Sequence, residues 1–512
     1  MIENNRTQKF VYNLVSTAFL QIVTMIVGFI TPRIILVYYG SEINGLVSSI
    51  SEFISYFNLV EAGLAGAAIY SLYKPLAQKD NEAISGVVSA AKRFYLLSGY
   101  IFVSLVLGLA FIYPAFVGIS ALSPVEVGLL VLVVGASGAL EFFTMSKYRV
   151  LLSADQRTYV ISLASIVSIV LNATVIVVLG SMRVNIVLMR FVALSSVFVR
   201  SFILYFYTKR RYKNISFSAT PNVKALDKRW SALFLQILGV VQSSAPIVLL
   251  TIVFNKNMAI ISVYSIFNMI IGGINGVLSI FVTGLSASFG DIIAKNEINT
   301  LQKSTREFEF AYYSLLTVVY SIAMVMLMPF IRIYTQGIND INYNLPIVGF
   351  LFVLNGLLYN VKTPQGMLVI SAGHYKETRV QSTIQAVIII VFGIILTPKL
   401  GLVGILIASC LSNLYRDIDL LFYIPKKVTN LPVKSTFFRI VCIFVSGGLI
   451  CLPMFFININ PLTFLEWFIT AAVVGVYAVA VVLVIALIFE RRELKNVYLR
   501  VLRLLPSSRK KD

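Results

Sequence analysis

Long hydrophobic stretches alternate with short polar connections along the whole chain. Most of these stretches hold twenty or more residues, and a helix rising about 1.5 Å per residue then crosses the roughly 30 Å of a bilayer core. The pattern predicts fourteen transmembrane helices, near residues 10–37, 44–72, 94–117, 125–147, 158–180, 184–208, 230–254, 259–289, 310–333, 343–370, 378–397, 402–424, 437–457 and 463–489.

The chain also repeats itself at a spacing of about 216 residues. FLQI occurs twice, followed by Pro32 in the first copy and Pro246 in the second, and Ser153–Ala154 lies over Ser371–Ala372. A longer match aligns SSVFVRSFILYFYTKRR (195–211) with LSNLYRDIDLLFYIPKK (411–427), and this alignment pairs Arg200 with Arg416. Six crossings return a chain to its starting side, so the copies run in the same sense.

This repeat predicts the domain organisation. We expect an N-lobe over residues 1–212 (helices 1–6) and a C-lobe over 213–428 (helices 7–12). Residues 429–512 then hold helices 13 and 14 and a basic tail. In duplicated membrane proteins the substrate site lies between the halves, so the pattern indicates a transporter.

The basic residues follow the predicted topology. The termini and alternate loops carry 33 Lys and Arg, whereas the intervening loops carry four. This positive-inside bias places both termini in the cytoplasm. The net charge of +20 therefore reflects topology, and we do not expect nucleic acid as a partner.

Composition excludes several functional classes. The chain is 58% hydrophobic and 12% charged, far from the charge content of soluble domains. Its three cysteines have no metal-ligand spacing, so we expect no metal and no cofactor. The sequence holds no P-loop, Gly-x-Ser-x-Gly, His-Glu-x-x-His or Cys-x-x-Cys motif, and the interpretation is that the protein is not an enzyme.

Several cations lie inside the predicted helices, where each costs about 2.5–3.5 kcal/mol at the bilayer centre. Arg200 and Arg416 lie nine and ten residues before the next basic cluster, which is roughly 13–15 Å along a helix. We predict that they face each other between the lobes and bind a phosphate or pyrophosphate group. The alternative is that Asp417 or Asp419 neutralises Arg416; Arg200 has no acidic residue near it in the sequence.

Three further cations are candidate substrate contacts. Arg33 follows Pro32 in the outer half of helix 1, where it either lines the substrate path or reaches the outer headgroups. Arg190 and Lys362 are cavity residues or interface anchors. We expect Pro32 and Pro246 to bend matching helices of the two repeats.

The acidic residues in the helices have two readings. Glu52 and Glu61 of helix 2, like Asp417 and Asp419 of helix 12, can carry a coupling proton or pair with a neighbouring cation. The sequence leaves the coupling ion open.

Four segments carry a family resemblance. The first two resemble the start of the polysaccharide-repeat-unit flippases of the Wzx type. They are PRIILVYYGSEINGLVSSISEFISYFNLVEAGL (32–64) and, after it, YSLYKPLAQKD (70–80). LLSADQRTY and LVISAGHYKETR resemble the same family at two later connections. These flippases share a superfamily with the MATE drug extruders and the lipid II flippases.

The resemblance implies an all-α integral membrane fold, with two six-helix lobes in a V and two extra C-terminal helices. It also implies that an undecaprenyl-pyrophosphate-linked oligosaccharide repeat unit is moved across the bacterial cytoplasmic membrane by alternating access, for surface or capsular polysaccharide. A polysaccharide polymerase and other assembly proteins are then candidate partners, beside the lipid bilayer. The alternatives are a flippase for lipid II or another lipid-linked precursor, or a cation-coupled multidrug extruder; the absence of an acid from helix 1 and the extra helices favour the flippases.

Overall fold

The chain is helical throughout the part that the structure describes. The computed structural model describes residues 2–223, 229–457 and 459–504, and these residues form helices and connections without a strand. Eleven of the helices in these ranges are long and apolar enough to cross a membrane. The first of them, Val11–Gln78, combines two predicted segments, and the total of fourteen crossings stays a prediction.

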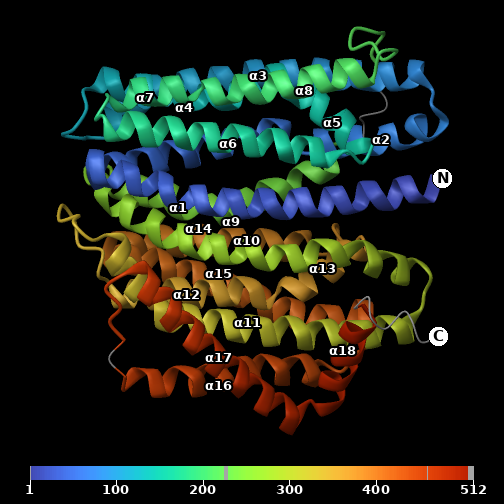
Figure 1. Ribbon diagram of the computed structural model, residues 1–512, viewed down its shortest axis with the longest axis vertical. Coiled ribbons are helices and arrows are strands. Elements are labelled where there is room, and N and C mark those ends of the chain that lie inside the picture. The colour runs from blue at the N-terminus through green and yellow to red at the C-terminus, as the bar shows by residue number, and fades with distance from the viewer. Residues whose placement is uncertain (1, 224–228, 458, 505–512) are drawn as a thin grey trace. The chain divides into compact units, whose positions relative to one another are not determined.

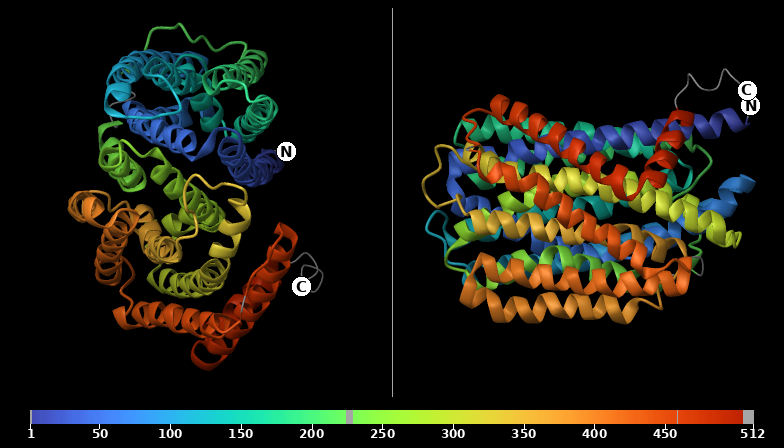
Figure 2. Two further views of the ribbon diagram at one scale, coloured as in Figure 1. Left: turned by 90° about the vertical axis from the view of Figure 1, so that its left-hand side faces the viewer. Right: turned by 90° about the horizontal axis from the view of Figure 1, so that it is seen from below.

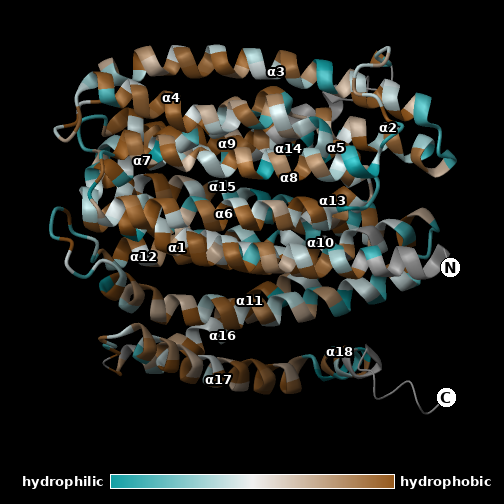
Figure 3. Ribbon diagram, turned by 45° about the horizontal axis from the view of Figure 1, so that its top comes forward, coloured by the Kyte–Doolittle hydropathy of each residue, from teal (hydrophilic) through white to brown (hydrophobic). Residues whose placement is uncertain are grey.

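Two compact units make up the fold. Unit 1 contains residues 1–269 together with 338–341, and unit 2 contains residues 270–337 and 342–512. Within each unit, most helices run side by side with their connections gathered at the helix ends (Figure 1 and Figure 2). Hydrophobic residues cover most of the length of the helices, and hydrophilic residues gather in the connections (Figure 3).

Unit 1 contains the first nine α-helices and the beginning of the tenth. The elements are α1 (Ile2–Phe57), η1 (Asn58–Glu61), α2 (Leu64–Gln78), α3 (Asn81–Phe116), α4 (Pro124–Leu140), η2 (Glu141–Met145), α5 (Ser146–Ala154), α6 (Thr158–Ser181), α7 (Ile186–Ala193), α8 (Ser195–Arg211), α9 (Arg229–Val253) and the start of α10 (Met258–Ala294).

Local sequence sets where several of these helices begin. Asp80 caps α3 by accepting hydrogen bonds from the backbone N–H groups of Glu82 and Ala83. Ser123 and Glu126 form a capping box at the start of α4. Each cap satisfies N–H groups that have no partner within the helix.

A glycine divides α1 into two helices. Gly40 has φ 84° and ψ 174°, a conformation that glycine adopts without a steric penalty. The next helix begins at Ser41, whose backbone N–H and hydroxyl both donate to the carboxylate of Asp340, at 2.6 and 2.7 Å. Asp340 therefore caps this helix from a distant part of the sequence.

Unit 2 contains the remaining helices. Its elements are the rest of α10, α11 (Ile298–Tyr334), α12 (Pro346–Val361), α13 (Thr363–Ser371), α14 (Arg379–Leu400), α15 (Leu402–Ile424), η4 (Pro425–Thr429), α16 (Val433–Phe455), α17 (Phe464–Phe489) and α18 (Arg491–Leu504).

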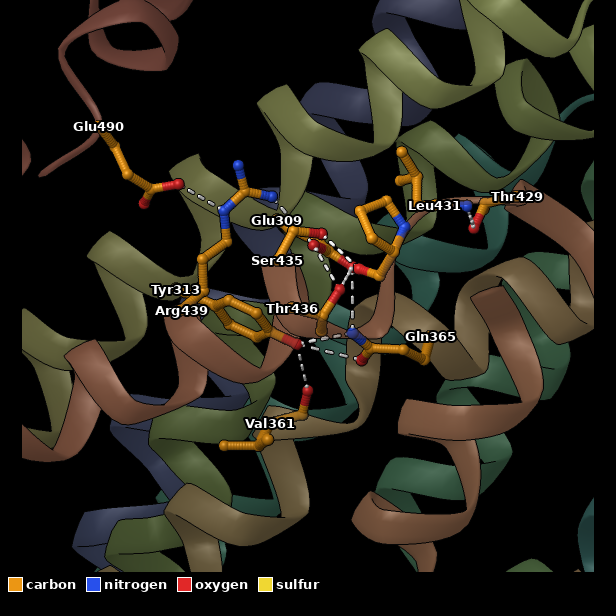
Figure 4. A network of polar contacts seen from close by, with 11 residues as sticks. Glu309, Tyr313, Val361, Gln365, Thr429, Leu431, Ser435, Thr436, Arg439 and Glu490 are labelled. Carbon is orange, nitrogen blue, oxygen red and sulfur yellow. Dashed lines mark hydrogen bonds and ion pairs between the residues drawn. The ribbon is translucent and has the colours of Figure 1, made fainter. Parts of the chain in front are cut away.

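A buried polar network fastens α16 and α17 to α11 (Figure 4). Arg439 of α16 bonds to Glu309 of α11 at 3.0 Å and to Glu490, directly after α17, at 2.6 Å. The side chains of Arg439 and Glu309 are 5% and 2% exposed, so both charges depend on protein partners and not on bulk solvent. Thr436 and Gln365 donate further hydrogen bonds to the Glu309 carboxylate.

A second charged cluster joins the first helix of unit 1 to the connection between α5 and α6. Asp155 accepts hydrogen bonds from Lys9 at 3.1 Å, Arg157 at 2.6 Å and the Tyr212 hydroxyl at 2.6 Å. Burial opposes ionisation of this carboxyl, but the three donors outweigh it, and the net effect lowers the pKa of Asp155.

The buried network predicts a strong effect of Arg439. Replacing Arg439 with Leu leaves Glu309 buried without a cation, which costs about 3–5 kcal/mol when a buried pair loses one partner. We expect a lower thermal midpoint for the purified protein. Lys295→Ala is the matched control, because both side chains of the Lys295–Asp291 pair are exposed, at 58% and 62%, and exposed pairs contribute little. Equal losses in the two variants would contradict this interpretation.

The Asp155 cluster predicts a dependence of stability on pH. A carboxyl whose pKa is lower in the folded than in the unfolded protein stabilises above its unfolded value of about 3.9. This stabilisation is lost as the pH falls through the folded value. We expect the thermal midpoint to decline as the pH falls below about 4, and to decline less steeply in Asp155→Asn. Parallel profiles of the two proteins would rule out a role for this carboxyl.

Candidate functional site

An interruption of regular helix lies at the centre of the candidate site. Between α4 and α5, residues Glu141–Met145 form a π-helix. The hydroxyl of Thr144 donates to the carbonyl of Leu140 at 2.5 Å, and that of Ser146 donates to the carbonyl of Glu141 at 3.0 Å. These bonds satisfy carbonyl groups near the interruption. π-turns inside α-helices occur frequently at functional sites.

Glu141, the first residue of this π-helix, lies between two guanidinium groups. Its Oε1 accepts from Arg200 of α8 at 2.6 Å, and its Oε2 accepts from Arg149 of α5 at 3.1 Å. One carboxylate thus serves two cations, and Glu61 lies close enough to Arg149 to interact with it electrostatically.

A cavity of about 340 Å³ adjoins this cluster within unit 1. Glu141 and Arg149 line it, together with Glu61, Asn58 and Ser137, and apolar side chains complete the lining. The cavity therefore offers a guanidinium, carboxylates, an amide and a hydroxyl in an otherwise apolar bundle. Such a set can bind an anion and several hydroxyl groups at once.

Arg200 is tied to the cluster instead of lining the cavity. Its side chain is 18% exposed, and its Nε is buried without a hydrogen-bond partner among the described residues. The sequence suggested no acidic neighbour for Arg200, but Glu141 of another helix supplies one. Whether Arg200 contacts substrate stays a prediction.

Arg416, the repeat partner of Arg200, is also paired. Its guanidinium bonds to Asp419 at 2.6 Å, three residues further along α15, as the neutralisation alternative expected. Asp417 is buried, and neither of its carboxylate oxygens has a hydrogen-bond partner in the described part of the chain.

Lys362 lies at the junction of α12 and α13. Its ammonium donates to the side-chain oxygen of Asn413 and lies 4.8 Å from the ring centroid of Tyr359. Asn413 in turn donates to Asn355 at 2.8 Å. Lys362 is therefore held within unit 2 by an amide pair and an aromatic face.

Apart from Glu61, the remaining predicted residues lie outside the lining of the cavity of unit 1. Arg33 is partly buried in α1, and Arg190, on α7, has a buried Nε without a hydrogen-bond partner in the described ranges. Pro32 and Pro246 lie within α1 and α9, each inside a continuous helical segment. Of the two acids in helix 2, Glu61 lines the cavity, whereas Glu52 lies near Ser244 of α9.

The sequence reasoning missed Arg149. The helix predicted over 125–147 ends just before this residue, but Arg149 belongs to α5 and lines the cavity. Its spacing from Glu141, eight residues or about two helical turns, was the available signal. As for metals, the described residues contain no group of three His, Cys, Asp or Glu side chains that could hold an ion.

Sequence comparisons identify no relative. No protein-family model matches the chain, and no curated protein matches it.

The fold, in contrast, matches solved membrane transporters over their whole length. The lipid II flippase MurJ in an inward closed conformation superposes with a TM-score of 0.69 at 14% identity, covering 94% of this chain and 99% of that one. An inward-facing multidrug resistance MATE family transporter of the MOP superfamily gives 0.64 at 16% identity, covering 81% and 99%. A MATE protein in the bent conformation gives 0.58 at 14% identity, covering 86% and 97%.

These likenesses establish the fold of the chain. It is the all-helical, multi-pass fold of MOP-superfamily transporters. The predicted fold is therefore confirmed, whereas the number of crossings and the repeat stay predictions. At 14–16% identity the likeness does not extend to the substrate.

The cluster predicts that Glu141 is required for the stability of its two arginines. Glu141→Gln removes the carboxylate to which both Arg149 and Arg200 bond, and we expect a loss of about 1–3 kcal/mol, typical of a polar group left unsatisfied. The double change Glu141→Gln with Arg200→Gln should recover part of the loss, because it removes the more buried cation. Thermal midpoints of the purified variants measure both effects.

Arg93→Gln, a change of an exposed cation of α3, is the control and should leave the midpoint unchanged. A Glu141→Gln protein as stable as the parent would show that the ion pairs contribute nothing to stability.

Proposed function

We propose that the protein is a flippase that moves an undecaprenyl-pyrophosphate-linked oligosaccharide repeat unit across the bacterial cytoplasmic membrane. In this proposal both termini lie in the cytoplasm, and two lobes, residues 1–212 and 213–428, alternate in access. One observation carries the proposal: a fold shared with a lipid-linked-precursor flippase encloses a polar cavity beside two guanidiniums that share one carboxylate.

The extent of the structural match supports a flippase over a drug extruder. The flippase covers 94% of this chain, whereas the inward-facing drug transporter, nearly all of which is matched, covers 81%. About a fifth of this chain thus lies outside the drug-transporter match. The segment that the sequence predicts beyond the repeat, residues 429–512 with helices near 437–457 and 463–489, is long enough to account for most of it.

The chemistry of the Glu141 cluster supports an anionic headgroup. A pyrophosphate cannot enter hydrocarbon unaided, because desolvating its charges costs tens of kcal/mol in the Born limit. Arg149 already lies at the cavity wall with a carboxylate as its partner. In our proposal a phosphate oxygen replaces the carboxylate of Glu141 on Arg149, and Glu141 keeps its bond to Arg200.

This exchange of anions limits the energetic penalty of binding. The guanidinium keeps an anionic partner before and after substrate enters, so no buried charge is left unpaired at either stage. Phosphate oxygens also match the fork of donors on Arg. The isoprenoid chain remains in the lipid while the headgroup occupies the cavity.

The other polar groups of the cavity suit a sugar. Asn58, Ser137 and Glu61 can donate to and accept from hydroxyl groups of the oligosaccharide. Arg200, Arg416, Arg33, Lys362 and Arg190 remain proposed contacts at other stages of transport. Glu52, Glu61, Asp417 and Asp419 remain candidates for ion coupling.

A lipid II flippase is the second candidate. The structural match to such a protein, with a TM-score of 0.69 over 94% of this chain, favours it specifically, and its substrate is also a lipid-linked precursor. The two candidates differ in their phenotypes: loss of a lipid II flippase stops growth, whereas loss of a repeat-unit flippase removes surface polysaccharide.

The proposal predicts that Arg149 is required for export. In a strain from which the gene has been deleted, we expect no surface polysaccharide, with growth and drug sensitivity unchanged. The parent gene should restore the polysaccharide, Arg149→Lys should restore part of it, and Arg149→Ala should restore less than about a tenth. Lys keeps the charge but loses the planar fork that binds two phosphate oxygens. The measurement is surface polysaccharide per cell, normalised to protein abundance in the membrane.

Arg93→Ala is the matched control and should export normally. Full export by Arg149→Ala at normal abundance would exclude the proposed anion site. Arrested growth of the deletion strain would instead favour the lipid II candidate, and drug sensitivity without polysaccharide loss would favour an extruder.

A further inference from the structure

An apolar groove of about 500 Å³ runs between α16 and α17. Its walls include Val441, Val445 and Leu449 of α16 and Val481, Val484 and Ile488 of α17. The lining presents no polar surface. Several of these side chains are well exposed, with Val445 at 53%, Val484 at 55% and Ile488 at 66%, so unit 2 leaves the groove open.

Different side chains bound the two ends of this groove. At one end, the rings of Phe438 and Phe489 meet edge to face, with centroids 5.8 Å apart. Towards the other, the Tyr477 hydroxyl donates to the carbonyl of Leu449 at 3.3 Å. The apolar lining extends over more than two turns of each helix, or roughly 14–16 Å, so it can hold part of an extended hydrocarbon chain.

Exposed cations follow the groove at the phenylalanine end. Lys434 lies one helical turn before Phe438, and Arg491 and Arg492 are the first residues of α18, two and three positions after Phe489. All three are exposed. Two acidic residues lie next to these arginines in the sequence. Glu490 is bonded to Arg439, and Glu493 accepts a hydrogen bond from Asn496 at 3.5 Å.

The position of these cations relative to the membrane follows from α17. This helix is one of the apolar helices able to cross a bilayer and ends at Phe489. Residues just beyond it therefore lie at the level of the lipid headgroups. The loop charges place this end in the cytoplasm, where the leaflet carries anionic lipids.

We propose that the groove holds an anionic phospholipid of the cytoplasmic leaflet, with an acyl chain between α16 and α17 and its phosphate among Lys434, Arg491 and Arg492. The apolar lining suits the chain, and the charge of the three cations complements the phosphate. The lipid is a bound component of unit 2, separate from the transported substrate and from the cavity beside Glu141. It adds contacts to α16 and α17, which Arg439 already joins to α11 through its bonds to Glu309 and Glu490.

A lipid titration tests this proposal. The purified full-length protein is titrated in detergent with dioleoylphosphatidylglycerol or dioleoylphosphatidylcholine while its thermal midpoint is followed. We expect the anionic lipid to raise the midpoint at a lower concentration than the zwitterionic lipid. In Arg491→Gln/Arg492→Gln, the half-saturating concentration of the anionic lipid should rise about 30-fold, from roughly five-fold for each cation removed.

Val484→Trp tests the groove itself, because the larger side chain occupies the space of the acyl chain. It should abolish the response to both lipids, whereas Arg93→Gln should change neither. Native mass spectrometry of the parent should retain one phosphatidylglycerol molecule, and that of Val484→Trp none.

Three results would overturn the proposal. The first is equal stabilisation by the two lipids, and the second is an unchanged response in the double variant. The third is displacement of phosphatidylglycerol by undecaprenyl phosphate at a lower concentration, which would assign the groove to the transported lipid. None of these results bears on the anion site at Arg149, since that site is tested by export.

Discussion

The fold depends on how it accommodates charged side chains in a bundle that hydrocarbon surrounds. An unpaired ion there costs several kcal/mol, and the pairing of a cation with an acid removes most of that penalty. The chain uses this solution repeatedly: Glu141 holds Arg200 and Arg149, Asp419 holds Arg416, and Glu309 with Glu490 holds Arg439. The pairs differ in their surroundings, and the surroundings distinguish a structural ion pair from a candidate binding site.

The Arg439 pair is closed, whereas the Glu141 pair is open. Arg439 and Glu309 are 5% and 2% exposed and have further hydrogen bonds around them, so there is little access for a large anion from solution. Glu141 and Arg149 are 35% and 38% exposed and line a cavity. An incoming anion can therefore reach that guanidinium. This contrast is the physical reason to place substrate at the second pair and a purely structural role at the first.

The sequence predicted the helices well because their signal is local. Every predicted hydrophobic segment lies on a helix or on consecutive helices, since twenty apolar residues leave the backbone few alternatives in lipid. The partner of Arg200 was not predictable in the same way. Glu141 lies 59 residues away, and only the packing of α8 beside the π-helix brings the two together. The π-helix itself depends on one additional residue in a turn, for which the sequence has no clear signal.

The repeat contributes one further step of argument about the site. The offset that places Ser153 on Ser371 also places Thr144, within the π-helix, on Lys362, where α12 ends and α13 begins. Both halves thus interrupt the same predicted helix at corresponding positions, and both interruptions lie beside a charged side chain. The two copies then differ in chemistry: the first holds two guanidiniums through one carboxylate, and the second holds an ammonium through an amide and an aromatic ring. The two interruptions thus present different chemistry, each within its own unit, and the guanidinium of Arg149 beside the first lies at a cavity wall where an anion can reach it.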